Sequence, residues 1–235
     1  MTNMEDKNDL PTKPIPEPTL RRLPVYYQYL KKIKDEKKGD FISCTQIGND
    51  LSILPIQVRK DLEVTEAVGK PKLGYGIEEL ITVIGDFLGW NNTKDAYLVG
   101  VGHLGTALLG FERFREHGLN IIAAFDIDAE KIGQTVHGVR VFHIKKLPDM
   151  VKRMGIKIGI LTTPAYSAQD LTDNMVKAGI KAIWNFSPEK VNVPPGIIVQ
   201  HENLAASLVV LSKKLALTLK AQLKDEVNDG NNEKI

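Results

Sequence analysis

Residues 95–105 read DAYLVGVGHLG and carry the strongest structural signal in the chain. A short apolar run leads into three glycines, Gly100, Gly102 and Gly105, and a segment compatible with a helix follows. In a dinucleotide-binding motif the first glycine makes a tight turn, the second lets the backbone approach a pyrophosphate, and the third permits close helix–strand packing. Asp126 ends a second apolar run and is placed to accept hydrogen bonds from a ribose. The stretch predicts a nucleotide-binding α/β domain in which the phosphates face the helix N-terminus.

The residues after the second apolar run indicate which nucleotide is preferred. Asp126 and Asp128 are acidic, and no arginine lies beside them in the sequence. This pattern disfavours a 2′-phosphate, so we expect NAD(H) rather than NADP(H). His103 lies inside the motif, and we interpret it as a variable residue at the head of the helix rather than as an acid–base group. The alternative for the glycines is a tight strand–helix turn in an unrelated α/β domain.

Strand and helix patterns alternate beyond residue 95, which predicts a doubly wound, mostly parallel sheet with helices on both faces. Residues 162–164 (TTP) follow one predicted strand and residues 185–186 (NF) follow another. Ligands of open α/β sheets bind at such carboxyl ends, so both segments are predicted on the nicotinamide side. The alternative is that they are ordinary turn formers. We predict strands at 95–99, 120–125, 139–143, 156–161, 181–184 and 197–200, and helices at 104–117 and 166–178.

The chain before residue 90 predicts a helical DNA-binding domain. Thr19 can cap a first helix. Ser43 and Gln46 have capping-box spacing at the start of a second helix, and Pro55 suits the first position of a third. Two short helices joined by about three residues indicate a helix-turn-helix. The predicted helices cover 19–38, 43–51 and 55–62, and a linker helix covers 77–89.

Polar and basic residues on the third helix and after it are candidates for DNA contacts. Arginine and lysine can read guanine edges or hold phosphate, and glutamine can pair with adenine. The basic, turn-rich segment 68–76 is typical of a wing, and residues 13–72 hold twelve Lys/Arg against eight Asp/Glu. The alternative is a solvated charged face, and the net charge of +2 is too small to decide. The candidates are Gln57, Arg59, Lys60, Lys70 and Lys72.

Composition excludes several classes of protein. Cys44 is the only cysteine, so neither an internal disulfide nor a cysteine metal cluster is expected. The sequence has no signal-peptide pattern and no apolar run of membrane-spanning length, and we expect a soluble cytoplasmic protein that binds neither metal nor membrane. Three histidines, His137, His143 and His201, form no catalytic pattern, and no substrate domain follows the nucleotide fold. A sensor is therefore favoured over the alternative of an NAD-dependent oxidoreductase with a helical N-terminal domain.

The predicted organisation has five parts. Leucines recur at three- or four-residue steps from Leu204 to Leu219, and such an apolar stripe after a completed sheet needs a partner surface. The proline-rich start of the chain is polar and is predicted to be flexible. The parts are a flexible arm at 1–18, a winged-helix domain at 19–90, a Rossmann domain at 95–200, a dimerisation helix at 201–225 and a flexible tail at 226–235.

Six motifs occur in one order: RLPVYYQYL at 22–30, QVRKDL at 57–62, LGY at 73–75, GVGHLG at 100–105, FDID at 125–128 and NF at 185–186. This order resembles the Rex family of redox-sensing transcriptional repressors of Gram-positive and related bacteria, over about residues 19–223. The resemblance implies a homodimer with an N-terminal winged helix, a Rossmann domain and a swapped C-terminal helix. It also implies that DNA is bound when NADH is scarce and that rising NADH releases the operator.

Some positions differ from the pattern of this family. Members often have Arg where this chain has Gln28 and Asp where it has Asn203, two positions thought to pair across the dimer. The segment 63–67 lacks the usual Ser-Tyr-Phe, and residues 71–72 are Pro-Lys where Arg-Gly is common. A regulator that senses another nucleotide, such as a coenzyme A derivative, is a further alternative, because the glycine turn recognises a pyrophosphate rather than a nicotinamide.

The expected sites follow from the motifs and the resemblance together. No residue is expected to be catalytic and none to bind metal. The predicted NAD(H)-binding residues are Gly100, Val101, Gly102, His103, Leu104, Gly105, Asp126, Ile127, Thr162, Thr163, Pro164, Asn185 and Phe186. The predicted DNA-binding residues are Arg22, Gln57, Arg59, Lys60, Lys70 and Lys72, and the predicted dimer and switch residues are Gln28, Tyr75, Asn203 and Leu204.

Overall fold

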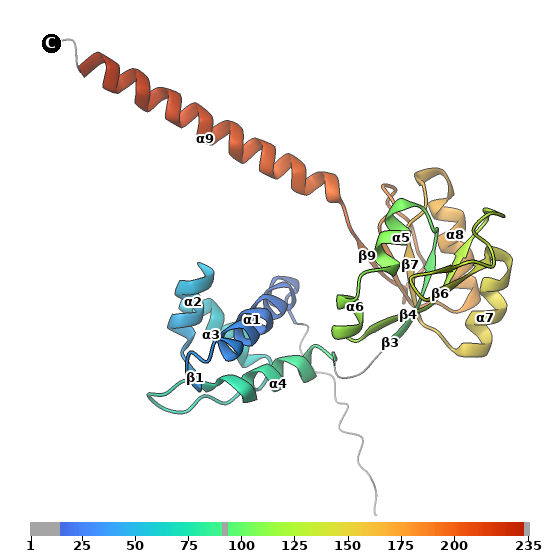
Figure 1. The fold of residues 1–235 in the computed structure, drawn as a ribbon, viewed down its shortest axis with the longest axis horizontal. Coiled ribbons are helices and arrows are strands. Elements are labelled where there is room, and N and C mark those ends of the chain that lie inside the picture. The colour runs from blue at the N-terminus through green and yellow to red at the C-terminus, as the bar shows by residue number, and fades with distance from the viewer. Residues whose placement is uncertain (1–14, 91–93, 233–235) are drawn as a thin grey trace, which may run out of the picture. The chain divides into compact units, whose positions relative to one another are not determined.

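The computed structural model describes residues 15–90 and 94–232 (Figure 1). The chain forms two compact units, Met1–Thr93 with Glu116–Gly118, and Lys94–Arg115 with Leu119–Ile235. Most of the predicted N-terminal arm lies outside the described residues. Within the described ranges, no helix is both long enough and apolar enough to cross a bilayer.

The first unit is a helical domain with a small two-stranded antiparallel sheet. Its buried core is built from residues at helical spacing on α1, such as Leu23, Tyr26 and Leu30, which pack against the other three helices. The predicted cap of the second helix is confirmed, because the Ser43 hydroxyl accepts a hydrogen bond from the Gln46 N–H at 3.1 Å. The elements are α1 (Glu17–Asp35), β1 (Phe41–Ile42), α2 (Cys44–Leu51), α3 (Pro55–Glu63), β2 (Tyr75–Gly76), which pairs antiparallel with β1, and α4 (Ile77–Phe87).

The predicted start of the first helix is wrong. Helix α1 begins at Glu17 with Pro16 in the capping position. Thr19 therefore lies inside the helix, and its hydroxyl donates to Asp61 on α3 at 2.9 Å instead of capping. The sequence signal failed because threonine serves equally well as a cap and as a donor to a buried carboxylate.

The second unit is a doubly wound sheet, as predicted. Seven strands lie in the order β5-β6-β4-β3-β7-β8-β9, and every pair is parallel except β5–β6. Alternate residues of β3 face two separate cores, one that includes α7 and α8 and one that includes residues of α5 and α6. The strands are β3 (Lys94–Val99), β4 (Leu119–Asp126), β5 (Thr135–Val136), β6 (Val139–His143), β7 (Ile158–Leu161), β8 (Ala182–Asn185) and β9 (Ile198–His201).

The helices of this unit differ from prediction in two places. The predicted helix 104–117 is two helices, because α5 ends at Leu109 with Gly110 as its C-cap. A Cβ atom on Gly110 would lie 2.9 Å from ring atoms of His137. Helix α7 was not predicted. The helices are α5 (His103–Leu109), α6 (Arg113–Glu116), the 3-10 turn η1 (Ile144–Lys146), α7 (Leu147–Met154) and α8 (Ala165–Ala178).

The chain continues from β9 into one long helix, α9 (Leu204–Asn232) (Figure 1). The side chain of Asn203 caps it by accepting a hydrogen bond from the Ala206 N–H at 3.1 Å. The helix extends beyond residue 225, into the segment predicted as a tail. Its described side chains, at 205–220, are all exposed, including the large apolar ones Leu208, Val209, Val210, Leu211, Leu215, Leu217 and Leu219.

Candidate functional site

A cleft of about 470 Å³ opens at the carboxyl ends of β3, β4 and β7 in the sheet unit. This edge is where open α/β sheets bind ligands, because the loops there leave the sheet in opposite directions. Of the predicted cofactor residues, the cleft is lined by Gly100, Gly102, Asp126, Ile127, Thr162, Thr163 and Pro164. Asp128, whose acidity favoured NAD(H), also lines the cleft. Sequence reasoning missed Lys131, Ile144, Tyr166, Ser167, Asp170 and Leu171, which complete its described wall together with Val99 and Phe125.

Different features of the structure account for glycine at the three motif positions. Gly100 has a φ of +99°, and a Cβ there would lie 2.8 Å from the Thr162 carbonyl oxygen. A Cβ on Gly105 would lie 2.0 Å from the Gly100 carbonyl oxygen. Gly102 has a φ of −80°, and a Cβ on it would meet no described atom within 4 Å. The protein fold itself does not require glycine at 102, so the bare backbone there leaves room for a ligand.

Asp126 ties the glycine turn to the end of β4. One carboxylate oxygen accepts from the Val101 N–H at 2.7 Å, and the other accepts from Ile127 at 2.7 Å and Asp128 at 2.9 Å. The Lys131 ammonium lies 3.2 Å from Asp128 and 3.7 Å from Asp126. The hydrogen bond to Asp128 raises the pKa of Lys131. Lys131 follows Asp128 by three residues, and a turn brings the two together, because the Lys131 N–H donates to the Asp128 carbonyl oxygen at 3.1 Å.

Two threonines at the end of β7 close the opposite wall. The Thr162 hydroxyl donates to the Gly100 carbonyl oxygen at 2.6 Å and so holds the glycine turn. Thr163 is only 9% exposed, and its hydroxyl has no hydrogen-bond partner among the described residues. Leaving a buried hydroxyl unpaired costs about 1–3 kcal/mol. The unpaired Thr163 hydroxyl is consistent with a cleft in which a bound polar molecule supplies the missing hydrogen bond.

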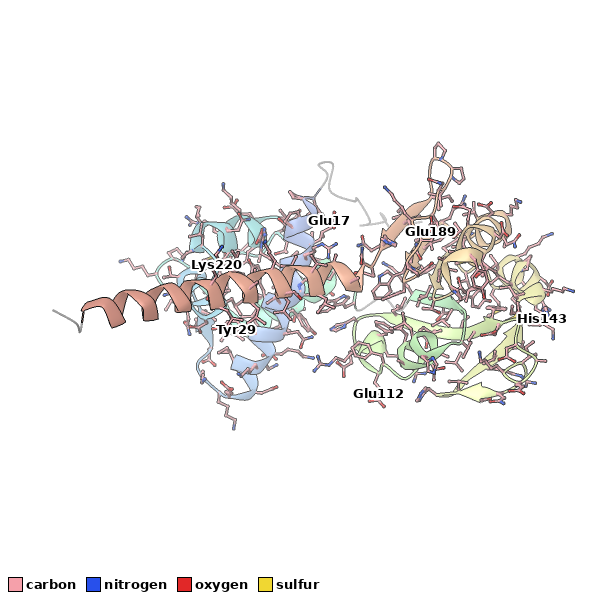
Figure 2. All side chains as sticks on the ribbon, turned by 90° about the horizontal axis from the view of Figure 1, so that it is seen from above. Glu17, Tyr29, Glu112, His143, Glu189 and Lys220 are labelled. Atoms are coloured by element: carbon pink, nitrogen blue, oxygen red, sulfur yellow. The ribbon has the colours of Figure 1, made fainter. Side chains whose placement is uncertain are left out.

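Asn185 and Phe186 lie at the end of β8 but are not among the described residues that line the cleft. Asn185 is fully buried, and its amide donates to the backbone carbonyl of Glu189, which is labelled in Figure 2, at 2.8 Å. The same amide lies 3.1 Å from His201 Nδ1. Phe186 packs on the Trp184 ring at 4.8 Å between centroids. The side chain of Asn185 thus links the end of β8 to the strand that precedes α9.

The remaining motif residues lie at the start of α5. His103 and Leu104 begin this helix directly after Gly102 and are not among the described lining residues. Their backbone position puts the helix N-terminus at the cleft, where unpaired N–H groups favour an anion.

In the helical unit, α3 presents a basic face. Arg59 and Lys60 are exposed, whereas Val58 and Leu62 are buried on the other side of the helix. A second cleft lies between the start of α2, the exposed side of α3 and the wing at 69–75. The predicted wing residues Lys70 and Lys72 line it, and the Lys70 ammonium lies 5.0 Å from the centroid of the Phe41 ring.

Arg22 and Gln57 were predicted to contact DNA. In the structure both side chains donate hydrogen bonds to Asp61. Arg22 donates Nε and Nη2 to its two oxygens at 2.6 and 2.8 Å, and Gln57 donates at 2.9 Å. Tyr26 and Thr19 complete the set at 2.7 and 2.9 Å. Burial alone would raise the pKa of Asp61, but the hydrogen bonds from Arg22 and the other donors lower it to about 2. Asp61 is therefore an ionised carboxylate inside the helical core.

Three of the four predicted switch residues, Gln28, Tyr75 and Asn203, have partners within their own units. Gln28 Nε2 lies 3.0 Å from His117 Nε2. Tyr75 is half-buried against Gly69, and burial raises the pKa of its hydroxyl. The side chain of Leu204 lies outside the described residues. In the described part of the chain, no three His, Cys, Asp or Glu side chains gather as metal ligands would.

Comparisons with known proteins agree with both units. Residues 14–63 match the family model of a putative DNA-binding protein N-terminus, and residues 91–189 match that of a CoA binding domain. The redox-sensing transcriptional repressor Rex of Treponema denticola is 50% identical over 194 residues, which cover 83% of this chain and 92% of that protein. The Bacteroides fragilis repressor of the same name is 43% identical, with 86% and 91% covered.

Solved structures give the same assignment. The crystal structure of RSP, a Rex-family repressor, in complex with beta-NAD+ and operator DNA has a TM-score of 0.82 at 32% identity and covers 92% of this chain and 99% of that one. RSP in complex with beta-NADH has a TM-score of 0.79, with 90% and 100% covered. These relatives are repressors, so the prediction of a regulator rather than an enzyme is confirmed. The chain belongs to the Rex family of redox-sensing transcriptional repressors.

Proposed function

We propose that this chain acts in the cytoplasm as a homodimeric repressor that binds operator DNA when NADH is scarce and leaves it when NADH rises. The cleft of the sheet unit holds the nucleotide. The exposed face of α3 and the wing hold the DNA. Two copies associate through α9.

The observation at Gly102 carries the nucleotide assignment. A glycine that neither backbone conformation nor packing requires, at the N-terminus of α5, leaves space for the close approach of a pyrophosphate. Asp126 lies on the ribose side, and its neighbour Asp128 disfavours a 2′-phosphate. The unpaired hydroxyl of Thr163 supplies a further polar group for the ligand.

The DNA assignment rests on charge and exposure. Arg59 and Lys60 are exposed on α3, and Lys70 and Lys72 extend the basic surface onto the wing. A recognition helix places such side chains at base edges, while wing lysines contact phosphates. RSP, which shares the fold at 32% identity, is solved with operator DNA.

The dimer assignment rests on α9. Its apolar side chains are exposed within one chain, and such a surface marks an interface. Truncation after Gln200 should therefore give monomers in sedimentation experiments, whereas the full chain should sediment as a dimer. A truncated chain that still dimerises would place the interface elsewhere.

Release by NADH follows from linkage. NADH must bind the DNA-incompetent arrangement more tightly than the competent one, since a ligand with equal affinity for both shifts nothing. A shift from mostly bound to mostly free needs a preference of about 5 kcal/mol. The two forms of the cofactor differ at the nicotinamide ring, which is charged only when oxidised, so an apolar ring site favours NADH.

The decisive experiment titrates NADH and NAD+ separately into a complex of the full chain with a fluorescent duplex operator. NADH should release the duplex, and NAD+ at the same concentration should not. The Gly102→Val variant should bind the duplex but lose the response to NADH. The proposal is wrong if NADH saturates the protein in calorimetry and the complex stays intact.

A coenzyme A derivative is the second candidate ligand. It is favoured by the match of residues 91–189 to the CoA binding domain model and by the preference of a glycine turn for any pyrophosphate. Competition separates the two, because coenzyme A should displace NADH only if it shares the cleft.

A further inference from the structure

Two large aliphatic side chains at the start of helix α3 are mostly exposed. Leu54, which precedes the helix, is 72% exposed, and Ile56, in its first turn, is 57% exposed. Burying such a side chain contributes about 1.5–3 kcal/mol, and neither residue gains it. A single exposed leucine is ordinary, but these two lie beside the basic face of the proposed recognition helix.

Leu54 also occupies the N-cap position of α3. Serine, threonine, aspartate or asparagine is preferred there, and within the described chain no side chain caps this helix. Helix α2, by contrast, is capped by Ser43. Leucine at this position cannot supply a capping oxygen to the helix N-terminus, and its side chain is mostly exposed rather than buried. A contact outside the folded chain accounts for both.

The surroundings of Ile56 identify the kind of partner. Ile56 lines the second cleft together with Arg59, and it shares one helical face with Arg59 and Lys60 because the three lie three and four residues apart. The described lining of this cleft contains three cations, Arg59, Lys70 and Lys72, and no carboxylate. A surface of this charge fits a polyanion rather than a helix of another protein.

The edges of DNA bases offer one apolar group in the major groove, the C5 methyl of thymine. We propose that Leu54 and Ile56 contact thymine methyl groups, so that the operator of this chain has thymine at fixed positions beside the base pairs read by the basic residues of α3. This inference rests on the proposed DNA binding and adds to it the chemistry of two operator positions.

The test removes the methyl from the DNA and the contact from the protein. Duplexes are first selected by the full chain from a random pool, and each thymine of the best duplex is then replaced by deoxyuridine. At one or two thymines per half-site, the wild type should lose affinity about fourfold per methyl. The Ile56→Ala and Leu54→Ser variants should each bind thymine and deoxyuridine equally well at one of those positions.

A matched control separates this contact from a general effect of lost aliphatic surface. Val25, on α1, is 47% exposed, and Val25→Ala should keep the full sensitivity to deoxyuridine. Leu54→Ser is expected to be at least as stable as the parent, so its loss of discrimination cannot come from unfolding. The inference is overturned if the wild type binds all deoxyuridine duplexes equally, or if both α3 variants keep the wild-type pattern. Failure of the full chain to bind any duplex would overturn the proposed DNA binding, and this inference with it.

Discussion

Asp61 in the helical unit and Asp126 in the sheet unit are both held by several hydrogen bonds, but their donors differ in kind. Asp61 is fully buried and accepts from four side chains of α1 and α3, those of Thr19, Arg22, Tyr26 and Gln57. Asp126 accepts from three backbone N–H groups and lies at a cleft, with its side chain 11% exposed. Side-chain donors join two helices, whereas backbone donors fix a loop and leave the carboxylate beside a ligand. The first aspartate is structural, and the second belongs to a site.

The contrast changes how the QVRKDL segment is interpreted. From sequence alone, Gln57 and Arg22 resemble DNA contacts because they lie among other basic and polar residues. In the structure both donate to Asp61, so their first role is to connect α1 to α3. Arg59 and Lys60, which are exposed, are the better candidates for base contacts.

Loss of the buried carboxylate gives the largest expected effect. Asp61→Ala leaves the half-buried Arg22 guanidinium without its partner, and breaking such a pair costs about 3–5 kcal/mol of unfolding free energy. Each unit contains one tryptophan, so urea unfolding of the Trp184→Phe protein reports the helical unit through Trp90.

Asp50→Ala is the matched control for this measurement. Asp50 is exposed and accepts one hydrogen bond from Tyr29, which is labelled in Figure 2. Its removal should cost only about 0.5–1.5 kcal/mol. Equal losses in the two variants would mean that the Asp61 network does not hold the helices together.

In the sheet unit, alanine substitutions at two glycines of the turn test which glycine is needed for stability and which for ligand binding. Gly105→Ala pushes a methyl against the Gly100 carbonyl oxygen and should destabilise the sheet unit by about 1–3 kcal/mol. Gly102→Ala meets open space, so it should leave stability unchanged while weakening NADH binding in calorimetry. Trp184 fluorescence in a Trp90→Phe background follows this unit. If the two variants lose equal stability, Gly102 has a packing role and the ligand argument fails.

The buried aspartate also predicts a dependence of stability on pH. The pKa of Asp61 is about 2 in the folded unit against 3.8 for the free group, so the unfolded chain takes up the proton first as pH falls. The stabilisation is complete above about pH 4 and is lost towards pH 2, and it amounts to on the order of 2 kcal/mol. Urea unfolding followed by Trp90 between pH 5 and 2 measures it. Asp61→Asn should flatten the profile, and an unchanged profile would assign the acid sensitivity to other carboxylates.

The sequence predicted features that depend on neighbours along the chain. The Ser43 cap, the strand at 139–143 and the alternation that gives the doubly wound sheet all come from local spacing. Helix α7 carried comparable signals, with Pro148 near its start and Gly155 in the left-handed conformation at its end. Its apolar residues Leu147, Met150, Val151 and Met154 also lie at helical spacing, so the local signals for this helix were all present in the sequence and were overlooked.

Features that depend on contacts across the fold were not predictable. The donors to Asp61 on α1 lie 35–42 residues away in sequence, so the network cannot be inferred from spacing. The lack of space for a side chain at Gly110, the C-cap of α5, comes from the His137 ring in the β5–β6 hairpin, which lies 27 residues further along the chain. The motif already predicted separate roles for its three glycines, and the fold adds the contacts: a Cβ on Gly102 meets open space, whereas a Cβ on Gly100 or Gly105 would meet backbone atoms.

The smallest expected effect lies at the start of α3 and has the opposite sign. Leu54→Ser supplies a side-chain oxygen for the unpaired N–H groups of the first turn and should stabilise the helical unit by about 1 kcal/mol. Ser43→Ala, which removes the cap of α2, should cost about as much, and both changes can be followed by Trp90. No gain from Leu54→Ser would mean that the turn is already satisfied and that leucine carries no penalty there. A gain in stability together with weaker binding to thymine-containing duplexes would mean that Leu54 stabilises the DNA complex at the expense of the free fold.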